Sequence, residues 1–169
     1  MPLIQFFPWR QVSRWTCIGC GECCRDYGVV LDFVEWLTIA QNFGPENVVR
    51  GIDSLFIRRL PDGSCSFLCQ LAGVPLCGLQ NMKPNACKLW PFKVLKEPRY
   101  GYADQAFFEY AGKKLYVYVD SNCAGLKYGA PTWEFSALTL REFADIALGN
   151  CKLQRNSTRN SHQYNERRF

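Results

Sequence analysis

Apolar residues recur at helical spacing in the stretch from Asp32 to Phe43. They fall three or four positions apart, so that one side of a helix would carry Phe33, Trp36, Leu37, Ala40 and Phe43. Asp32 is a suitable N-cap, and Gly44-Pro45 is typical of the end of a helix. We therefore predict a short amphipathic helix over 32–43, with its aromatic stripe in the core.

A second helix is predicted near the end of the chain, from Thr139 to Leu148. Thr139 and Glu142 have the spacing of a capping box, and Gly149 can end the helix. The buried face of this helix would carry Leu140, Phe143, Ala144 and Ala147.

Runs rich in aromatic and β-branched residues indicate strands between the two helices. The segment Pro61-Asp62-Gly63 has the residues of a tight turn and predicts a hairpin of 55–60 with 64–68. Three further strands are expected over 92–96, 105–110 and 114–120, the last two joined by a turn at Ala111-Gly112-Lys113. The predicted fold class is α+β, a small irregular single domain with short helices, hairpins and cysteine-ligated sites.

Composition supports a folded body and excludes wholesale disorder. The chain has 169 residues, of which 48% are hydrophobic and 15% aromatic, enough for one domain with its own core. The composition shifts near Cys151, which predicts a cysteine-cluster domain over 1–151 and a polar tail over 152–169.

Positive charge is concentrated in that tail. Of the net charge of +5, the tail supplies +4, from five basic residues against the single acid Glu166. The nearly neutral body excludes a protein whose whole surface follows phosphates. A solvated tail is the preferred interpretation. The alternative is docking of 152–169 on RNA, DNA, a ribonucleoprotein or an acidic partner.

No segment has the pattern of a signal peptide or a membrane span. The N-terminal aromatic patch is interrupted by Pro2, Pro8 and Arg10, and no run approaches 18 apolar residues. We expect a cytoplasmic protein, in which thiols stay reduced and a dense cysteine set indicates metal or redox chemistry rather than disulfides.

The ten cysteines dominate the candidate chemistry, because the only histidine is His162. The segment Cys17-x-x-Cys20-x-x-Cys23-Cys24 resembles the opening of a bacterial ferredoxin run. Gly19 and Gly21 allow the loop to curl around one ion or cluster. The fourth cysteine of a ferredoxin run is missing, since Tyr27 and Gly28 stand in its place, so further ligands must come from elsewhere.

Cys23 and Cys24 place a constraint on ligation. In an extended backbone, adjacent side chains project to opposite sides. The two thiols would then serve two centres, or one would be a ligand and the other a small packed group. A vicinal disulfide is a strained alternative.

The remaining cysteines are spread along the chain. Several occur beside Gly or Pro, in loops that suit ligands converging from distant places: Cys65, Cys77, Cys87 and Cys123. For Cys69 and Cys151 a buried or incidental thiol is the preferred interpretation.

The combined cysteine pattern, from Cys17 to about Gly129, resembles the CxxCxxCC cysteine-cluster proteins, described as zinc- or iron-chelating. It comprises the opening segment, Asp62-Gly63-x-Cys65-x-Phe67-Leu68, Cys77, Lys83-Pro84-x-x-Cys87-x-x-x-Pro91-Phe92 and Cys123-x-Gly125. The family often has Arg-Pro where this chain has Lys83-Pro84, and Arg where it has Lys88. The resemblance implies eight metal ligands: Cys17, Cys20, Cys23, Cys24, Cys65, Cys77, Cys87 and Cys123. Some members are similar to flagellin lysine N-methylases, but the chain lacks a glycine-rich loop that would cradle a nucleotide-like cofactor.

The leading hypothesis is a thiolate metal-binding protein with a structural or electron-transfer role. The eight cysteines would form two four-thiolate sites, or one larger cluster with a second ion. An iron–sulfur cluster such as 4Fe-4S is preferred over zinc, which is the alternative. All-cysteine zinc sites usually have paired C-x-x-C knuckles, and only one end of this cysteine set has that form.

Two other hypotheses stay open. One is a redox or protein-modifying enzyme, with Glu22 and Asp26 as acid–base candidates and Arg25 and Lys88 as anion contacts, although solvent-facing loop charges are the preferred interpretation of these four. The other is a metal-stabilised interaction module that docks through the tail over 152–169.

Overall fold

The computed structural model describes residues 5–79 and 82–151, and the predicted tail over 152–169 lies outside them. The chain divides into two compact units. Of the described residues, the first unit contains 5–18 and 88–151, and the second contains 19–79 and 82–87. Both combine helices with antiparallel strands, which confirms the α+β class.

An antiparallel sheet forms the centre of the first unit. Its long strand β10 (Lys113–Asp120) pairs with β1 (Phe6–Pro8), β8 (Phe92–Leu95) and β9 (Phe107–Tyr110). A separate ribbon joins β2 (Val12–Trp15) to β11 (Leu126–Tyr128). The 3-10 helix η1 (Trp9–Gln11) lies between β1 and β2, and the short helix α4 (Ala103–Ala106) precedes β9.

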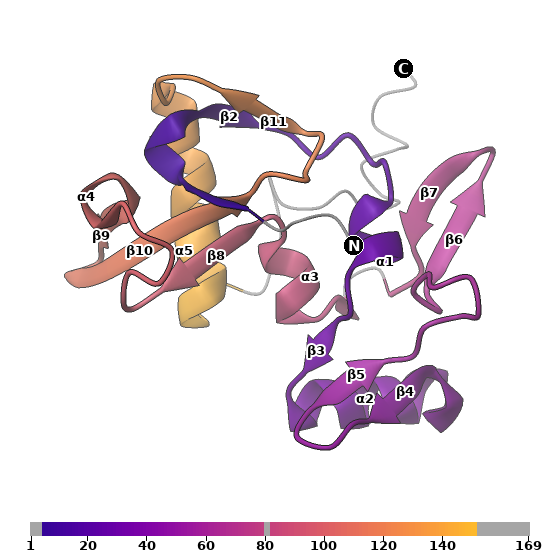
Figure 1. Cartoon of the computed structure of the whole chain (residues 1–169). Coiled ribbons are helices and arrows are strands. Elements are labelled where there is room, and N and C mark those ends of the chain that lie inside the picture. The colour runs from indigo at the N-terminus through magenta and orange to yellow at the C-terminus, as the bar shows by residue number, and fades with distance from the viewer. Residues whose placement is uncertain (1–4, 80–81, 152–169) are drawn as a thin grey trace. The chain divides into compact units, whose positions relative to one another are not determined.

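The helix α5 (Leu140–Leu148) packs against β8 of this sheet (Figure 1). Phe143 of α5 contacts Phe92 of β8 and Trp15 of β2, with ring centroids 4.2 Å and 5.3 Å away. This aromatic cluster is the middle of a core that also contains Trp9, Val12, Val117, Val119, Leu126, Phe135 and Leu140.

The predicted strands of this unit are largely confirmed. The strands over 92–96 and 114–120 correspond to β8 and β10, and the turn at Ala111-Gly112 has both residues at positive φ. The strand predicted over 105–110 is only half right, because 103–106 form α4 and the strand begins at Phe107.

The start of α5 was predicted incorrectly from the sequence. Thr139 has helical φ and ψ and makes no capping bond, because a π-helical segment, η4 (Phe135–Thr139), continues directly into α5. The end is confirmed, since Gly149 adopts the left-handed conformation with φ 75°. Leu140, Phe143 and Ala144 are buried as predicted, but Ile146 is buried more fully than Ala147.

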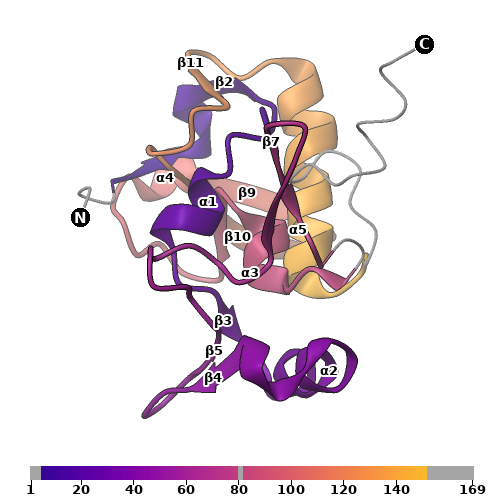
Figure 2. The same ribbon diagram turned by 90° about the vertical axis from the view of Figure 1, so that its right-hand side faces the viewer.

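The second unit is built around a three-stranded antiparallel sheet and one longer helix (Figure 2). The strand β5 (Leu55–Ile57) lies between β3 (Val30–Leu31) and β4 (Val48–Arg50), and α2 (Phe33–Phe43) packs beside them. Its other elements are α1 (Glu22–Asp26), η2 (Pro45–Asn47), β6 (Leu68–Leu71), β7 (Val74–Cys77) and the start of α3 (Asn85–Leu89).

The helix α2 confirms the prediction of its limits. Asp32 and Glu35 form a reciprocal capping box, and Gly44 follows the last turn. The predicted core face is partly wrong: Ile39 is the buried residue, whereas Phe33 is 65% exposed. The apolar residues of α2 do recur at helical spacing, but the three-stranded sheet covers only some of them.

The hairpin of 55–60 with 64–68 forms only in part. The turn at 61–63 is present, but the arms meet in a single bridge between Arg59 and Cys65. The strand β5 pairs with β3 and β4 instead, while β6 pairs with β7. The core of the unit contains Val29, Leu31, Ile39, Val48, Ile57, Cys65, Phe67 and Leu79.

None of the helices formed by residues 5–79 and 82–151 has both the length and the apolar character needed to cross a bilayer.

Candidate metal centre

Four of the eight predicted ligands meet in the core of the second unit. Cys65 belongs to that core and is 6% exposed, and three partly buried cysteines pack against it: Cys24, Cys77 and Cys87. They come from four separate segments, namely α1, the stretch after the turn at 61–63, the end of β7, and α3. The four cysteines therefore converge from distant parts of the sequence, although three of them lie in helices or a strand rather than in loops, and their role as ligands stays a prediction.

Main-chain hydrogen bonds connect three of these four segments. The N–H of Cys65 donates to the carbonyl oxygen of Cys24 over 2.7 Å, and the N–H of Gly78 donates to the carbonyl oxygen of Phe67 over 2.7 Å. The first bond joins α1 to the turn, and the second joins the end of β7 to the residues that follow Cys65. The segments that carry Cys24, Cys65 and Cys77 are therefore positioned by main-chain hydrogen bonds.

The loop that leads into α1 depends on glycine. Gly21 is the N-cap residue with φ 77°, and a Cβ there would lie 2.9 Å from Cβ of Pro75. Both the left-handed backbone and the close approach exclude a larger residue. The prediction that Gly19 and Gly21 adopt special conformations is confirmed, since Gly19 has φ 68°.

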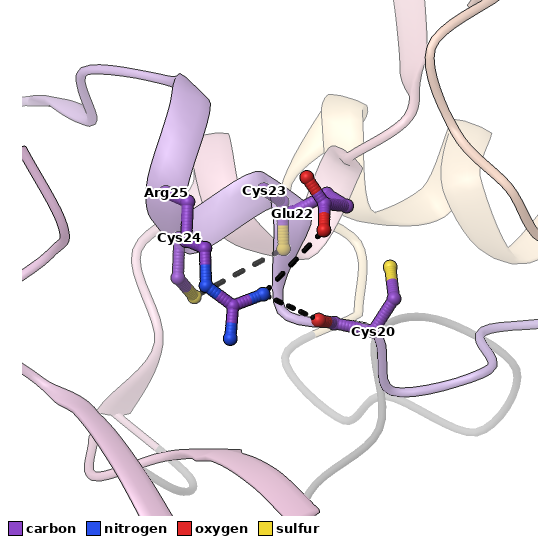
Figure 3. A network of polar contacts seen from close by, with 5 residues as sticks. All are labelled: Cys20, Glu22, Cys23, Cys24 and Arg25. Carbon is purple, nitrogen blue, oxygen red and sulfur yellow. Dashed lines mark hydrogen bonds and ion pairs between the residues drawn. The ribbon is translucent and has the colours of Figure 1, made fainter.

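Cys23 and Cys24 lie on a helix and not on the extended backbone assumed from the sequence. Their Sγ atoms are 4.0 Å apart in α1 (Figure 3), about twice the length of an S–S bond, so the vicinal disulfide is not formed. On a helix, adjacent residues are separated by about 100° rather than 180°. The extended backbone expected for Cys23 and Cys24 is therefore wrong, and whether the two thiols serve one centre or two stays a prediction.

The thiols of the cluster have unequal acidity. A hydrogen bond from Cys23 lowers the pKa of Cys24 to about 7, against the opposing effect of burial. Burial raises the pKa of Cys65 to about 11, and negative charge at Cys24 and Cys77 adds to the rise. Desolvation and the neighbouring thiols raise the pKa of Cys87 well above its usual value.

These shifts show that the cluster resists accumulating negative charge. Negative charge on neighbouring cysteines raises the pKa of Cys65 and of Cys87, so four thiolates can exist together only if a cation neutralises them. Within residues 5–79 and 82–151, no three His, Cys, Asp or Glu side chains are arranged as a ready metal-binding group. The four cysteines thus share a core but do not stand in ligand geometry.

Positive side chains near the cluster were not identified from the sequence as part of the site. Lys83 is only 3% exposed, and its charge lowers the pKa of Cys24 and of Cys87. Arg59 acts in the same way on Cys24 and Cys65, and its guanidinium donates to the carbonyl oxygen of Arg25. The only sequence feature that pointed to Lys83 was the Lys-Pro step four residues before Cys87.

The other four predicted ligands are placed differently. Cys20 and Cys23 belong to the second unit, whereas Cys17 and Cys123 pack against the core of the first. The indole N–H of Trp15 donates to Sγ of Cys123 over 3.3 Å. The ligand role of these four cysteines stays a prediction.

The remaining candidates have simpler surroundings. Glu22 is paired with Arg25 at 3.4 Å, and Arg25 also donates to the carbonyl oxygen of Cys20 over 2.8 Å (Figure 3). Asp26 is exposed, and the exposed Cys69 thiol lies 3.7 Å from the carbonyl oxygen of Phe67. The acid–base role of Glu22 and Asp26 stays a prediction.

Comparison with family models, with curated proteins and with solved structures found no match to this chain.

Proposed function

We propose that this chain is a thiolate metal-binding protein with a structural or electron-transfer role. The observation that carries the proposal is the convergence of Cys24, Cys65, Cys77 and Cys87, from four separate segments, on one core. Four thiolates are the donor set of both structural zinc and iron–sulfur clusters, so the residues fit either group. A bound group would supply the positive charge that lets these thiols ionise together.

An iron–sulfur cluster is the preferred occupant, and zinc is the alternative. The preference rests on the ferredoxin-like spacing of Cys17, Cys20 and Cys23 and on the single histidine. Cys17, Cys20, Cys23 and Cys123 complete the proposed set of eight ligands on the basis of spacing and family resemblance.

The test is metal and acid-labile sulfide analysis, with a visible absorption spectrum, on protein purified without oxygen. Iron with sulfide and a brown chromophore would support the cluster, whereas a colourless protein with bound zinc would support closed structural sites. Protein that contains neither metal, and takes up neither on reconstitution, would refute the proposal.

Three variants test which cysteines are ligands. Cys65→Ser is expected to lose the metal of the four-cysteine cluster, while Cys69→Ser, an exposed cysteine nearby in sequence, is the matched control and should keep it. For the other four ligands, Cys20→Ser is expected to lose metal and stability, because site formation and folding are coupled. Full metal content and an unchanged melting temperature would dismiss Cys20 as a ligand.

A further inference from the structure

The indole N–H of Trp15 is a buried donor that is directed at the sulfur of a proposed ligand. It donates to Sγ of Cys123 over 3.3 Å, and both residues belong to the first unit. Trp15 is 5% exposed, and the ring centroids of Phe92 and Phe143 lie 5.5 Å and 5.3 Å from its own. These edge contacts fix the orientation of the indole ring, and with it the direction of its N–H.

The turn that carries Cys123 is joined to the end of β2, the strand that contains Trp15. The N–H of Thr16 donates to the carbonyl oxygen of Gly125 over 3.1 Å, and the N–H of Leu126 donates to the carbonyl oxygen of Cys123 over 3.2 Å. A Cβ at Gly125 would lie 3.3 Å from the indole nitrogen, so the glycine allows that nitrogen to lie close to the turn. Donor and sulfur are therefore positioned by the backbone as well as by the aromatic core.

The value of this contact depends on the charge of the sulfur. A neutral thiol is a weak acceptor, whereas a hydrogen bond to an ionised acceptor is about twice as strong as one between neutral groups. Another tryptophan of the same core, Trp9, donates its indole N–H to a carbonyl oxygen, that of Phe107, over 3.1 Å. The N–H of Trp15 stabilises its partner most when Cys123 is a thiolate, the form in which cysteine binds metal.

We propose that Trp15 is a positioning residue for Cys123, whose N–H donates to the metal-bound thiolate and strengthens metal binding at the centre to which Cys123 belongs. The inference rests on the proposed function, in which Cys123 is one of the ligands. Partners that hydrogen-bond a ligand from outside orient it and change the affinity of the site. Loss of the Trp15 donor would therefore weaken the centre without removing a ligand.

The test titrates the full chain, freed of metal and reduced, with Co²⁺ in the absence of oxygen. The readout is the part of the thiolate-to-cobalt charge-transfer absorbance that Cys123→Ser removes. Trp15→Phe keeps an aromatic ring but has no N–H, and it is expected to weaken this Co²⁺ binding by about tenfold. The remaining band is expected at longer wavelength, because a sulfur that accepts no hydrogen bond gives up charge to the metal at lower energy.

The matched control is Trp9→Phe, which removes a buried indole and its hydrogen bond from the same core but leaves the contact at Cys123 in place. This variant is expected to lose stability in urea as Trp15→Phe does, and to keep the Co²⁺ affinity and the band position of the wild type. Replacement of Trp15 by 3-benzothienylalanine, which keeps the two-ring shape with sulfur in place of the N–H, gives the same readouts if phenylalanine prevents folding.

The outcomes separate this inference from the proposed function. Wild-type affinity and band position after loss of the Trp15 N–H would overturn the inference. Equal weakening by Trp9→Phe would also overturn it, because the effect would then come from lost packing. If Cys65→Ser removes charge-transfer absorbance and Cys123→Ser removes none, metal binding by the four-cysteine cluster stands and the role of Trp15 is refuted. A chain with no thiolate-to-cobalt band would refute both.

Discussion

The N–H of Cys65 donates to the carbonyl oxygen of Cys24 over 2.7 Å, so two thiol-bearing segments are joined through their backbones. Both residues use main-chain atoms for this bond and leave their sulfur atoms for other partners. Replacing either side chain therefore does not remove the bond. Effects of cysteine substitutions on metal content can thus be read separately from effects on this connection.

Chelation is expected to lower the melting temperature of the protein as isolated. If the four-cysteine cluster holds metal, its removal takes away free energy that is coupled to folding, and a drop of more than about 5 °C is expected. Thermal unfolding followed by circular dichroism, with and without EDTA under reducing conditions, measures it. Cys65→Ser is the control and should respond less. A metal-containing wild type that melts at the same temperature after chelation would contradict the prediction.

Cysteine alkylation of the metal-free protein is expected to follow the order of the thiol pKa values. At pH 7 about half of Cys24 is thiolate, since its pKa is about 7, whereas Cys65, with a pKa of about 11, is almost entirely protonated. Iodoacetamide should therefore modify Cys24 before Cys65, and the rate at Cys24 should rise with pH and level off above about 8. Mass spectrometry after timed quenching gives the order.

The same experiment with metal provides its control. Zn²⁺ is expected to protect Cys24, Cys65, Cys77 and Cys87, while the exposed Cys69 continues to react. Modification of Cys65 ahead of Cys24 in the metal-free protein would show that the acidity order is wrong.

Removing the cap of α2 is expected to destabilise the second unit. Asp32 Oδ1 accepts the N–H of Glu35 at 2.8 Å, and Asp32→Ala leaves that donor without its acceptor, at a cost of about 1 kcal/mol. Urea denaturation measures the free energy of unfolding. Asp53→Ala removes an exposed carboxylate outside any helix and serves as the control. Equal stability of the two variants would refute the capping role.

Gly125 is expected to tolerate no side chain. A Cβ at this position would lie 2.2 Å from the carbonyl oxygen of Thr16, so Gly125→Ala must displace the backbone of Thr16, directly after β2, or the turn that contains Gly125. The expected loss of stability is about 1–3 kcal/mol. Gly28→Ala is the matched control, because a Cβ there meets no atom within 4 Å. Comparable denaturation midpoints for the two alanine variants would contradict the prediction.

Features set by local chemistry could be predicted from the sequence. The limits of α2 follow from Asp32, Glu35 and Gly44, all of which act within one or two turns of the helix. The end of α5 at Gly149 is similarly local. The start of α5 was predicted incorrectly because a capping pattern does not reveal a preceding π-helical segment. Thr139 is a residue type that often caps helices, but here it has helical φ and ψ.

Features set by tertiary packing could not be predicted. The apolar stripe of α2 does not reveal that Phe33 stays exposed, because this depends on how much of the helix the sheet covers. The spacing of Cys23 and Cys24 did not reveal a helix, which begins at Glu22. The burial of Lys83 could not be predicted either, because only the folded chain shows that a charged residue is buried.

The four clustered cysteines lie far apart in the sequence, and this determines what a shared ligand would do to the unfolded chain. A group bound to all of them would close three successive loops, the longest from Cys24 to Cys65, and the entropy of the denatured ensemble would fall as it does with cross-links. The longest loop contains β3, α2, β4 and β5. These elements would therefore open most readily when the ligand is lost, although none of them supplies a thiol.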